Sequence, residues 1–148
     1  MKYDGNVTDP YNLNRFVMAQ EGVYASVISE LMQGRKTGHW IWFIFPQIAG
    51  LGHSPVSQRY SLSSIQEARA YNAHPVLGHR LAECTNLVLA ANDRTVEQIF
   101  GQLDALKFRS CMTLFSVADP ENEIFQRAVD RCFEGQPDTL TLKALISD

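Results

Sequence analysis

Six consecutive apolar residues at positions 40–45 (WIWFIF), closed by Pro46, limit what this chain can fold into. A run of this length fits either a fully buried strand or a buried turn of helix, and periodicity does not separate the two. Its aromatic and β-branched residues favour a strand. The rest of the chain offers no second strand candidate, however, and a lone buried strand would leave its backbone hydrogen-bonding groups unpaired. We therefore expect a helical turn at 40–46.

Helical patterns fill the remainder of the chain, because apolar residues recur at three- and four-residue intervals between turn signals. Asp9, Asp104 and Asp119 are predicted to be N-caps, Thr95 with Gln98 forms a capping box, and His74 leads into a helix. The expected helices span about 10–20, 24–34, 56–62, 64–71, 75–91, 95–101, 104–119, 120–135 and 138–146. The pattern predicts a single all-α domain of about eight helices over residues 9–148, after an N-terminal tail at 1–8.

Composition indicates one ordinary globular domain. The 148 residues are 45% apolar, 10% aromatic and 20% charged, as in compact soluble proteins. Three widely spaced cysteines do not make a disulfide framework. Residues 1–9 lack the apolar stretch of a signal peptide, and the longest apolar run is far shorter than a membrane span. We expect a cytoplasmic protein with no membrane association.

Charge and motifs exclude several classes of function. The chain has 13 Lys and Arg against 16 Asp and Glu, a net charge of -3, which argues against a nucleic-acid partner. The four histidines lack metal-ligand spacing, so no metal site is expected. Residues 50–52 (GLG) lack the third glycine and the preceding strand of a dinucleotide fingerprint, so no cofactor is expected. No nucleophile elbow, Walker loop or paired-carboxylate motif is present.

Polar residues around the aromatic block are the candidate ligand-binding residues. Arginine suits bidentate binding of phosphate or carboxylate, tryptophan can stack on a flat group, and a histidine at the start of the block could act as acid or base. Lys107 and Ser110 lie at helical spacing, although a solvated Asp104–Lys107 pair is the commoner role of such a pattern. The candidates are Arg35, His39, Trp42, Gln47, Ser54, Arg59, Lys107 and Ser110.

Several sequence blocks together carry a family resemblance. They are 9–20 (DPYNLNRFVMAQ), 34–47 (GRKTGHWIWFIFPQ), 50–54 (GLGHS), 74–81 (HPVLGHRL), 99–107 (IFGQLDALK), 110–115 (SCMTLF) and 135–138 (GQPD). The chain resembles a bacterial family of domains of unknown function, some members of which carry the label calpastatin. That label implies nothing for this chain, because calpain inhibitors of that kind are long and disordered whereas this composition is compact.

The resemblance implies a mainly α-helical fold without an established activity, and it favours helix at 40–46. Members of the family more often have serine where this chain has Cys111, which makes Cys111 a poor candidate for a nucleophile.

Two hypotheses about function follow. One is a pocket beside Trp40–Phe45 that binds a small anionic or nucleotide-like ligand, with or without a reaction on it; Arg35, Arg59 or Lys107 would hold the anion. The alternative is a non-enzymatic protein-interaction domain, which predicts an exposed apolar patch.

Overall fold

The computed structural model describes residues 8–147, which form ten helices and no strand. The all-α class is confirmed. The nine expected ranges and the turn at 40–46 correspond one to one to the ten helices, so the expected total of about eight was too low. The expected tail at 1–8 lies outside the described residues apart from Thr8. In chain order the helices are α1 (Asn14–Gln20), α2 (Tyr24–Met32), α3 (Ile41–Ile44), α4 (Pro55–Arg59), α5 (Ile65–Ala73), α6 (Leu77–Ala90), α7 (Val96–Phe100), α8 (Gln102–Ala118), α9 (Ile124–Phe133) and α10 (Thr139–Ser147).

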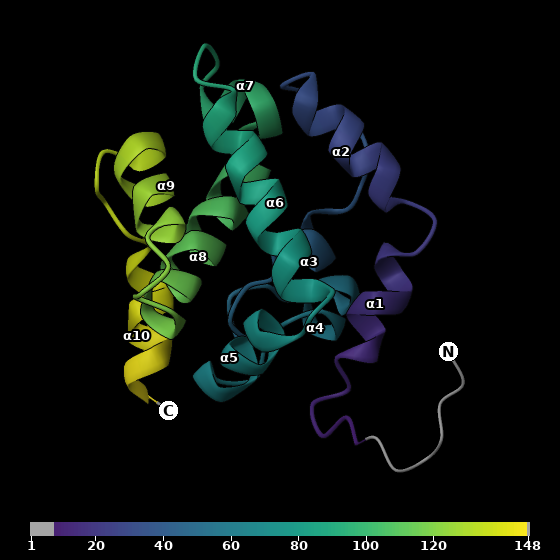
Figure 1. Cartoon of the computed structure of the whole chain (residues 1–148). Helices are drawn as coiled ribbons and strands as arrows, with labels where there is room; N and C mark the ends of the chain where they lie inside the picture. The colour runs from purple at the N-terminus through teal and green to yellow at the C-terminus, as the bar shows by residue number, and fades with distance from the viewer. Residues whose placement is uncertain (1–7, 148) are drawn as a thin grey trace.

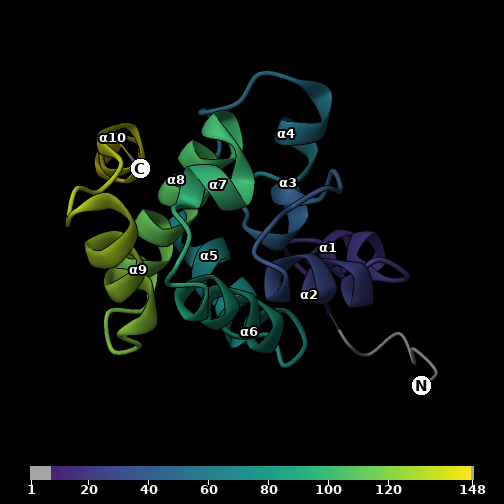
Figure 2. The ribbon, with the colours of Figure 1, turned by 90° about the horizontal axis from the view of Figure 1, so that it is seen from above.

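Helix α8 is the central element of the fold. It packs against α3, α5, α7, α9 and α10, and Figures 1 and 2 show α9 and α10 on one side of it with α1–α4 on the other. Its residues 110–115 (SCMTLF) are all buried, so this helix is enclosed on every side rather than along one stripe. The core of the domain is therefore built around the middle of α8.

The aromatic block forms the helical turn α3, as its sequence predicts. Phe45 packs edge-on against Phe108 of α8, with ring centroids 4.9 Å apart, and against Phe100 of α7 at 5.9 Å. The carbonyl of Phe43 accepts hydrogen bonds from Gln20 Nε2 at 2.8 Å and from the Tyr71 hydroxyl at 3.4 Å. Buried side chains thus supply hydrogen-bond partners that a short helix cannot provide for itself.

Arg15 of α1 joins four parts of the chain. Its guanidinium donates to the carbonyls of Tyr11, Asn12, Arg59 and Ser61 and, at 3.0 Å, to the Glu67 carboxylate. All five N–H donors of arginine are used in this way. The Glu67 side chain is only 3% exposed, and it also accepts hydrogen bonds from the backbone and hydroxyl of Ser63. The Arg15–Glu67 ion pair fixes α1 against the start of α5, and the bond from Arg15 to the Arg59 carbonyl fixes it against α4.

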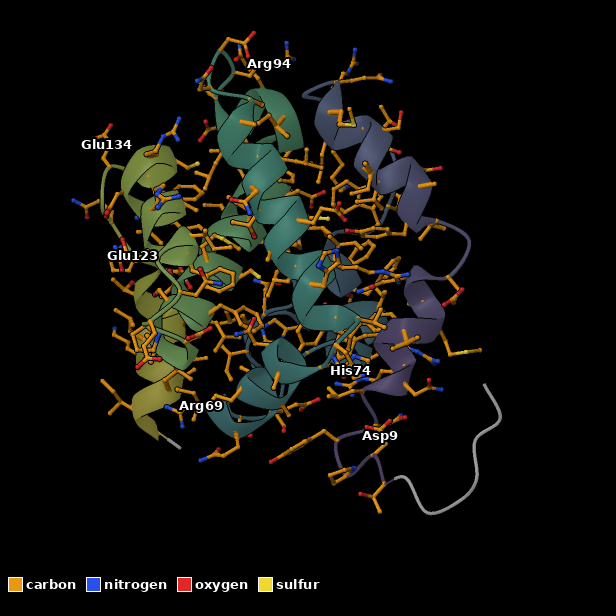
Figure 3. All side chains as sticks on the ribbon, in the orientation of Figure 1. Asp9, Arg69, His74, Arg94, Glu123 and Glu134 are labelled. Atoms are coloured by element: carbon orange, nitrogen blue, oxygen red, sulfur yellow. The ribbon has the colours of Figure 1, made fainter. Side chains whose placement is uncertain are left out.

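The expected capping box and the expected role of His74 are confirmed. Thr95 and Gln98 form the capping box of α7. Ser64 in addition caps α5 by accepting from the Glu67 amide. His74, labelled in Figure 3, accepts from the Val76 and Leu77 amides through Nδ1, and so leads into α6 as predicted.

The three expected aspartate N-caps are wrong as helix starts. Asp9 accepts from the Leu13 and Asn14 amides (Figure 3), but α1 begins only at Asn14 because Asn12 adopts a left-handed conformation, with φ 54°. Asp119 ends α8 instead of beginning α9, and its carboxylate accepts from Asn72 of α5.

Asp104 lies inside α8 because Gly101 makes the turn. The φ of 82° at Gly101 lets α8 begin at Gln102, directly after α7, in a backbone region that favours glycine. Asp104 therefore occupies the first turn, where its charge is favourable at a helix N-terminus, and its carboxylate is left to pair with lysine side chains.

Replacing Arg15 by methionine should destabilise the domain strongly. The variant keeps the apolar stem but leaves Glu67 charged, buried and without its cation, so we expect a loss of about 3 kcal/mol in the free energy of unfolding, or roughly 10 °C in Tm. Urea and thermal denaturation would measure both. The matched control is Arg127→Met on the exposed face of α9, which should stay within about 0.5 kcal/mol of wild type; equal losses in the two variants would contradict the prediction.

Candidate functional site

A single carboxylate oxygen shapes the turn that precedes the aromatic block. Glu30 Oε1 accepts hydrogen bonds from the Thr37 amide at 2.7 Å, the Gly38 amide at 2.9 Å and the Trp40 indole N–H at 2.9 Å. Trp40 is buried, with 3% exposure, and its N–H needs such a partner. Glu30 therefore fixes both the path of residues 37–40 and the orientation of the indole ring.

The charge of Glu30 is stabilised by these donors. Burial raises the pKa of Glu30, but the hydrogen bonds from Gly38, Thr37 and Trp40 outweigh it, and the resulting pKa lies below the usual range for a glutamate. Hydrogen bonds to the ionised form have this effect. Glu30 is accordingly a structural anion at neutral pH and not a general acid.

Lys36 links this turn to α7 and α8. Its backbone amide donates to the Ile99 carbonyl at 2.7 Å, near the C-terminal end of α7. Its side chain is only 7% exposed, and Nζ lies 2.7 Å from Asp104 Oδ2, 2.6 Å from the Gly38 carbonyl and 5.2 Å from the centroid of the Trp40 ring. A carboxylate, a carbonyl and an aromatic face together offset the cost of burying an ammonium group.

Lys107 approaches the same carboxylate from the other side. It follows Asp104 by three residues on α8, its Nζ lies 3.6 Å from Asp104 Oδ1, and its side chain is 27% exposed. We call the group Glu30, Lys36, Trp40, Asp104 and Lys107 the Lys36 cluster. It brings together the blocks 34–47 and 99–107, whose nearest ends are 52 residues apart in the chain.

Gly34 allows a second contact to reach this segment. The Arg94 Nε donates to the Gly34 carbonyl at 2.7 Å, and Figure 3 shows Arg94 at the end of the molecule where α2 and α6 terminate. A Cβ at position 34 would lie 2.6 Å from Arg94 Cδ, and φ there is 73°. The positive φ favours glycine at this position, and a side chain there would also displace Arg94 from the Gly34 carbonyl.

The candidate residues divide into two groups. Lys107 belongs to the Lys36 cluster, and Arg35 and His39 lie on the same turn with exposed side chains. The other candidates have structural contacts elsewhere: Trp42 is half-buried against the core, the Gln47 carbonyl accepts from the Leu62 amide, and Ser54 caps α4.

Arg59 and Ser110 do not join the cluster. Arg59 of α4 stacks on Tyr60, with its Cζ 5.7 Å from the ring centroid. Ser110 follows Lys107 by one turn of α8, but its buried hydroxyl donates to the Leu106 carbonyl or to Asp138 Oδ2, each at 3.1 Å, and is therefore directed toward the start of α10.

Sequence reasoning missed Lys36, Asp104 and Glu30 as site residues. Lys36 stands beside the candidate Arg35, but its side chain and not that of Arg35 is directed into the protein. The sequence did contain one signal. Asp104 and Lys107 lie at helical spacing, and Lys36 is a second cation with which the same carboxylate could pair.

The Lys36 cluster pairs two lysines with two carboxylates, and Lys107, with 27% of its side chain exposed, is the ammonium group that can reach an outside anion. The thiols are unsuited to nucleophilic attack: burial raises the pKa of Cys111 well above its ordinary value and that of Cys84 to about 12.

Among the described residues, no group of three or more His, Cys, Asp or Glu is placed to hold a metal ion. Nor does any helix within 8–147 have the length and apolar character needed to cross a membrane.

Replacing Glu30 by glutamine should lower stability in a pH-dependent way. At pH 7 we expect a loss of about 1–2 kcal/mol, because a neutral amide oxygen accepts the three hydrogen bonds more weakly. The native pKa is depressed, so the ionised carboxyl contributes stability above its unfolded pKa of about 4.3, and that contribution disappears as the pH falls through the lower native value. Urea denaturation from pH 7 to pH 3 should show the two proteins converging.

The control for this prediction is Glu121→Gln, since Glu121 is exposed and lies outside the cluster. A constant gap between wild type and Glu30→Gln across the pH range would contradict the assigned role of the Glu30 charge.

Comparison with known proteins identifies the family. The chain is similar to the solved structure described as the crystal structure of the conserved hypothetical protein Rv1873 from Mycobacterium tuberculosis, with 49% sequence identity and a TM-score of 0.92 over 93% of this chain and 99% of that chain. None of the curated proteins matches significantly. The family model described as "Protein of unknown function (DUF1810)" matches residues 10–145, so the chain belongs to this family.

Proposed function

We propose that this chain is a cytoplasmic domain that binds a small anionic or nucleotide-like ligand at the Lys36 cluster, beside the aromatic block. The observation that carries the proposal is the meeting of two ammonium groups from separate segments at one carboxylate, Lys36 at 2.7 Å and Lys107 at 3.6 Å from Asp104. Glu30 supplies a second carboxylate to the cluster, so the charges of the two lysines are balanced. Lys107, which is the more exposed lysine and makes the longer ion pair, is the cation available to an incoming anion.

The surrounding charges support this proposal. Arg35 adds an exposed guanidinium on the same turn, so three cations (Arg35, Lys36 and Lys107) are grouped with two carboxylates (Glu30 and Asp104). The chain as a whole carries a net charge of -3. A local excess of cations on an acidic protein is therefore a specific feature of this surface, and guanidinium and ammonium groups are the usual partners of phosphate and carboxylate.

The two lysines have different roles in this proposal. Lys36 is almost fully buried and already has a carboxylate and a carbonyl as partners, so it positions Asp104 and holds the turn against α8. Lys107 is more exposed and makes the longer ion pair. An anionic ligand would therefore contact Lys107 directly, with the exposed Arg35 and His39 as its neighbours.

A thermal-shift screen of the full chain tests the proposal. The panel contains inorganic phosphate, nucleotides, sugar phosphates and small carboxylates. A ligand at about one hundred times its Kd adds about 2.7 kcal/mol, a rise of several degrees in Tm. We expect Lys107→Met to lose most of this rise and Lys107→Arg, which keeps the charge, to retain it. The rise should also fall as salt increases, because the attraction is between exposed charges.

Arg127→Met, an exposed charge change on α9, serves as the control and should keep the full rise. A ligand whose effect survives in Lys107→Met would place binding elsewhere and contradict the proposal. Absence of any rise across the panel would favour the second candidate function.

That second candidate is a non-enzymatic protein-interaction domain, and exposed apolar side chains favour it. Leu103 and Leu106 lie one turn apart on α8 and are 73% and 57% exposed. Leu140 and Ile146 of α10 are also exposed. Large apolar side chains that gather on neighbouring helices are typical of surfaces that contact another protein.

A further inference from the structure

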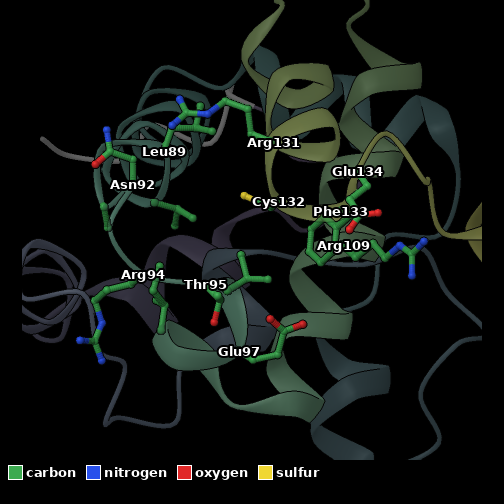
Figure 4. A pocket seen from close by; sticks show the side chains of 14 residues that line it. Leu89, Asn92, Arg94, Thr95, Glu97, Arg109, Arg131, Cys132, Phe133 and Glu134 are labelled. Carbon is green, nitrogen blue, oxygen red and sulfur yellow. The ribbon is translucent and has the colours of Figure 1, made fainter.

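The pocket between α7 and α9 carries charges of both signs and selects no ligand by them. Arg94, Arg109 and Arg131 line it and are directed in three different directions in Figure 4, and Glu97 and Glu134 lie among them. The Arg109 guanidinium is turned away from the interior of the pocket. Arg109 belongs to α8, and the exposed side of this helix carries a more ordered set of side chains.

The first two turns of α8 expose two large apolar side chains. Leu103 and Leu106 are 73% and 57% exposed, although residues 110–115 of the same helix are all buried. Because the two leucines are three residues apart, their side chains are neighbours on one face of the helix. We call this pair, together with Lys107 and Arg109, the α8 leucine face.

Lys107 lies along one edge of this face. It follows Leu103 by four residues, so the two side chains are adjacent on the helix. Its partner Asp104 is shared, because Oδ2 of that carboxylate is 2.7 Å from Lys36 Nζ whereas Oδ1 is 3.6 Å from Lys107 Nζ. The Lys107 ammonium group is therefore the less neutralised of the two.

Arg109 lies along the opposite edge. At 3.6 residues per turn it is displaced from Leu106 in the direction away from Lys107. Its Nε donates to the Gln136 carbonyl, and its Cζ lies 5.5 Å from the centroid of the Phe133 ring. Within residues 8–147, no carboxylate forms an ion pair with it. Two apolar side chains are thus flanked by a cation on each side.

The charge of this face restricts what can cover it. A second copy of the chain, related by a twofold axis, would bring the same cations against each other. An anionic membrane would meet a chain with a net charge of -3, which is repelled as a whole. A short protein segment contacts only the local surface, and acidic residues beside its apolar ones complement both edges.

We propose that the α8 leucine face docks a segment of a protein partner in which apolar side chains are flanked by Asp and Glu. The apolar side chains cover Leu103 and Leu106, and the carboxylates pair with Lys107 and Arg109. The inference rests on the second candidate function, the protein-interaction domain, and specifies the chemistry of its partner.

Selection from a display library of random peptides on the immobilised full chain tests the proposal. We expect the enriched peptides to combine Leu, Ile, Phe or Met with Asp or Glu. A synthetic copy of the most enriched peptide, titrated into the ¹⁵N-labelled full chain, should shift the amides of residues 102–110 in NMR spectra. Its binding should weaken as salt increases, because exposed charges contribute to it.

Variants of the face locate the contacts. Leu103→Gln and Lys107→Met should each weaken binding of the selected peptide about tenfold, as the loss of one important contact implies, and Lys107→Arg should retain it. The matched controls are Met18→Gln on α1, where Met18 is 65% exposed, and Arg127→Met on the exposed face of α9. Both controls should bind as wild type does, and thermal denaturation checks that every variant is folded.

Several outcomes would overturn the proposal. Enriched peptides that are apolar but not acidic, and that still lose affinity in Leu103→Gln, would refute the acidic partner and leave the protein-interaction function standing. Peptides whose binding ignores Leu103, or no enrichment at all, would refute both. Binding to phosphatidylserine vesicles that is lost in Leu103→Gln would assign the face to a membrane. A dimer seen by sedimentation and lost in the same variant would assign it to a second copy.

Discussion

The fold depends on the hydrogen bonds that side chains make to the buried backbone of α3. An apolar segment in the middle of an all-helical domain has no neighbouring strand to pair with, so its polar backbone groups need side-chain partners. Gln20 and Tyr71 supply these to the Phe43 carbonyl, and Arg80 of α6 donates to Gln20 Oε1 at 3.1 Å. One buried carbonyl thus fixes α1, α5 and α6 around the aromatic block, and the buried side chains leave no polar atom unpaired in the described residues.

The same block makes the Lys36 cluster rigid. Its first residue, Trp40, is held by Glu30 of α2, and its rings pack on Phe100 of α7 and Phe108 of α8. Lys36 lies between these fixed elements, so its ammonium group has little freedom to follow a ligand. The turn at 34–40 is therefore held in one conformation, which would reduce the cost of ordering it in the ligand complex proposed above.

The sequence predicts local structure well where one physical rule decides it. The absence of a second strand candidate is enough to predict a helical turn at Trp40–Phe45, and the Thr95 and Gln98 spacing is enough for the capping box. An aspartate before a helical segment is ambiguous, since Asp104 has the same local pattern whether it caps a helix or pairs with a distant lysine. The pocket between α7 and α9 leaves no local signal at all, because its lining residues are brought together only by the packing of α6, α7, α8 and α9.

The short helix α7 is held by the segment that carries the Lys36 cluster. Five residues are too few to be stable alone, and α7 is held by its capping box at one end and by the Lys36 amide on the Ile99 carbonyl near the other. The backbone of Lys36 makes this contact, while its side chain pairs with Asp104 of α8. Because one residue joins the turn at 34–40 to both α7 and α8, the formation of α7 is coupled to the folding of that turn.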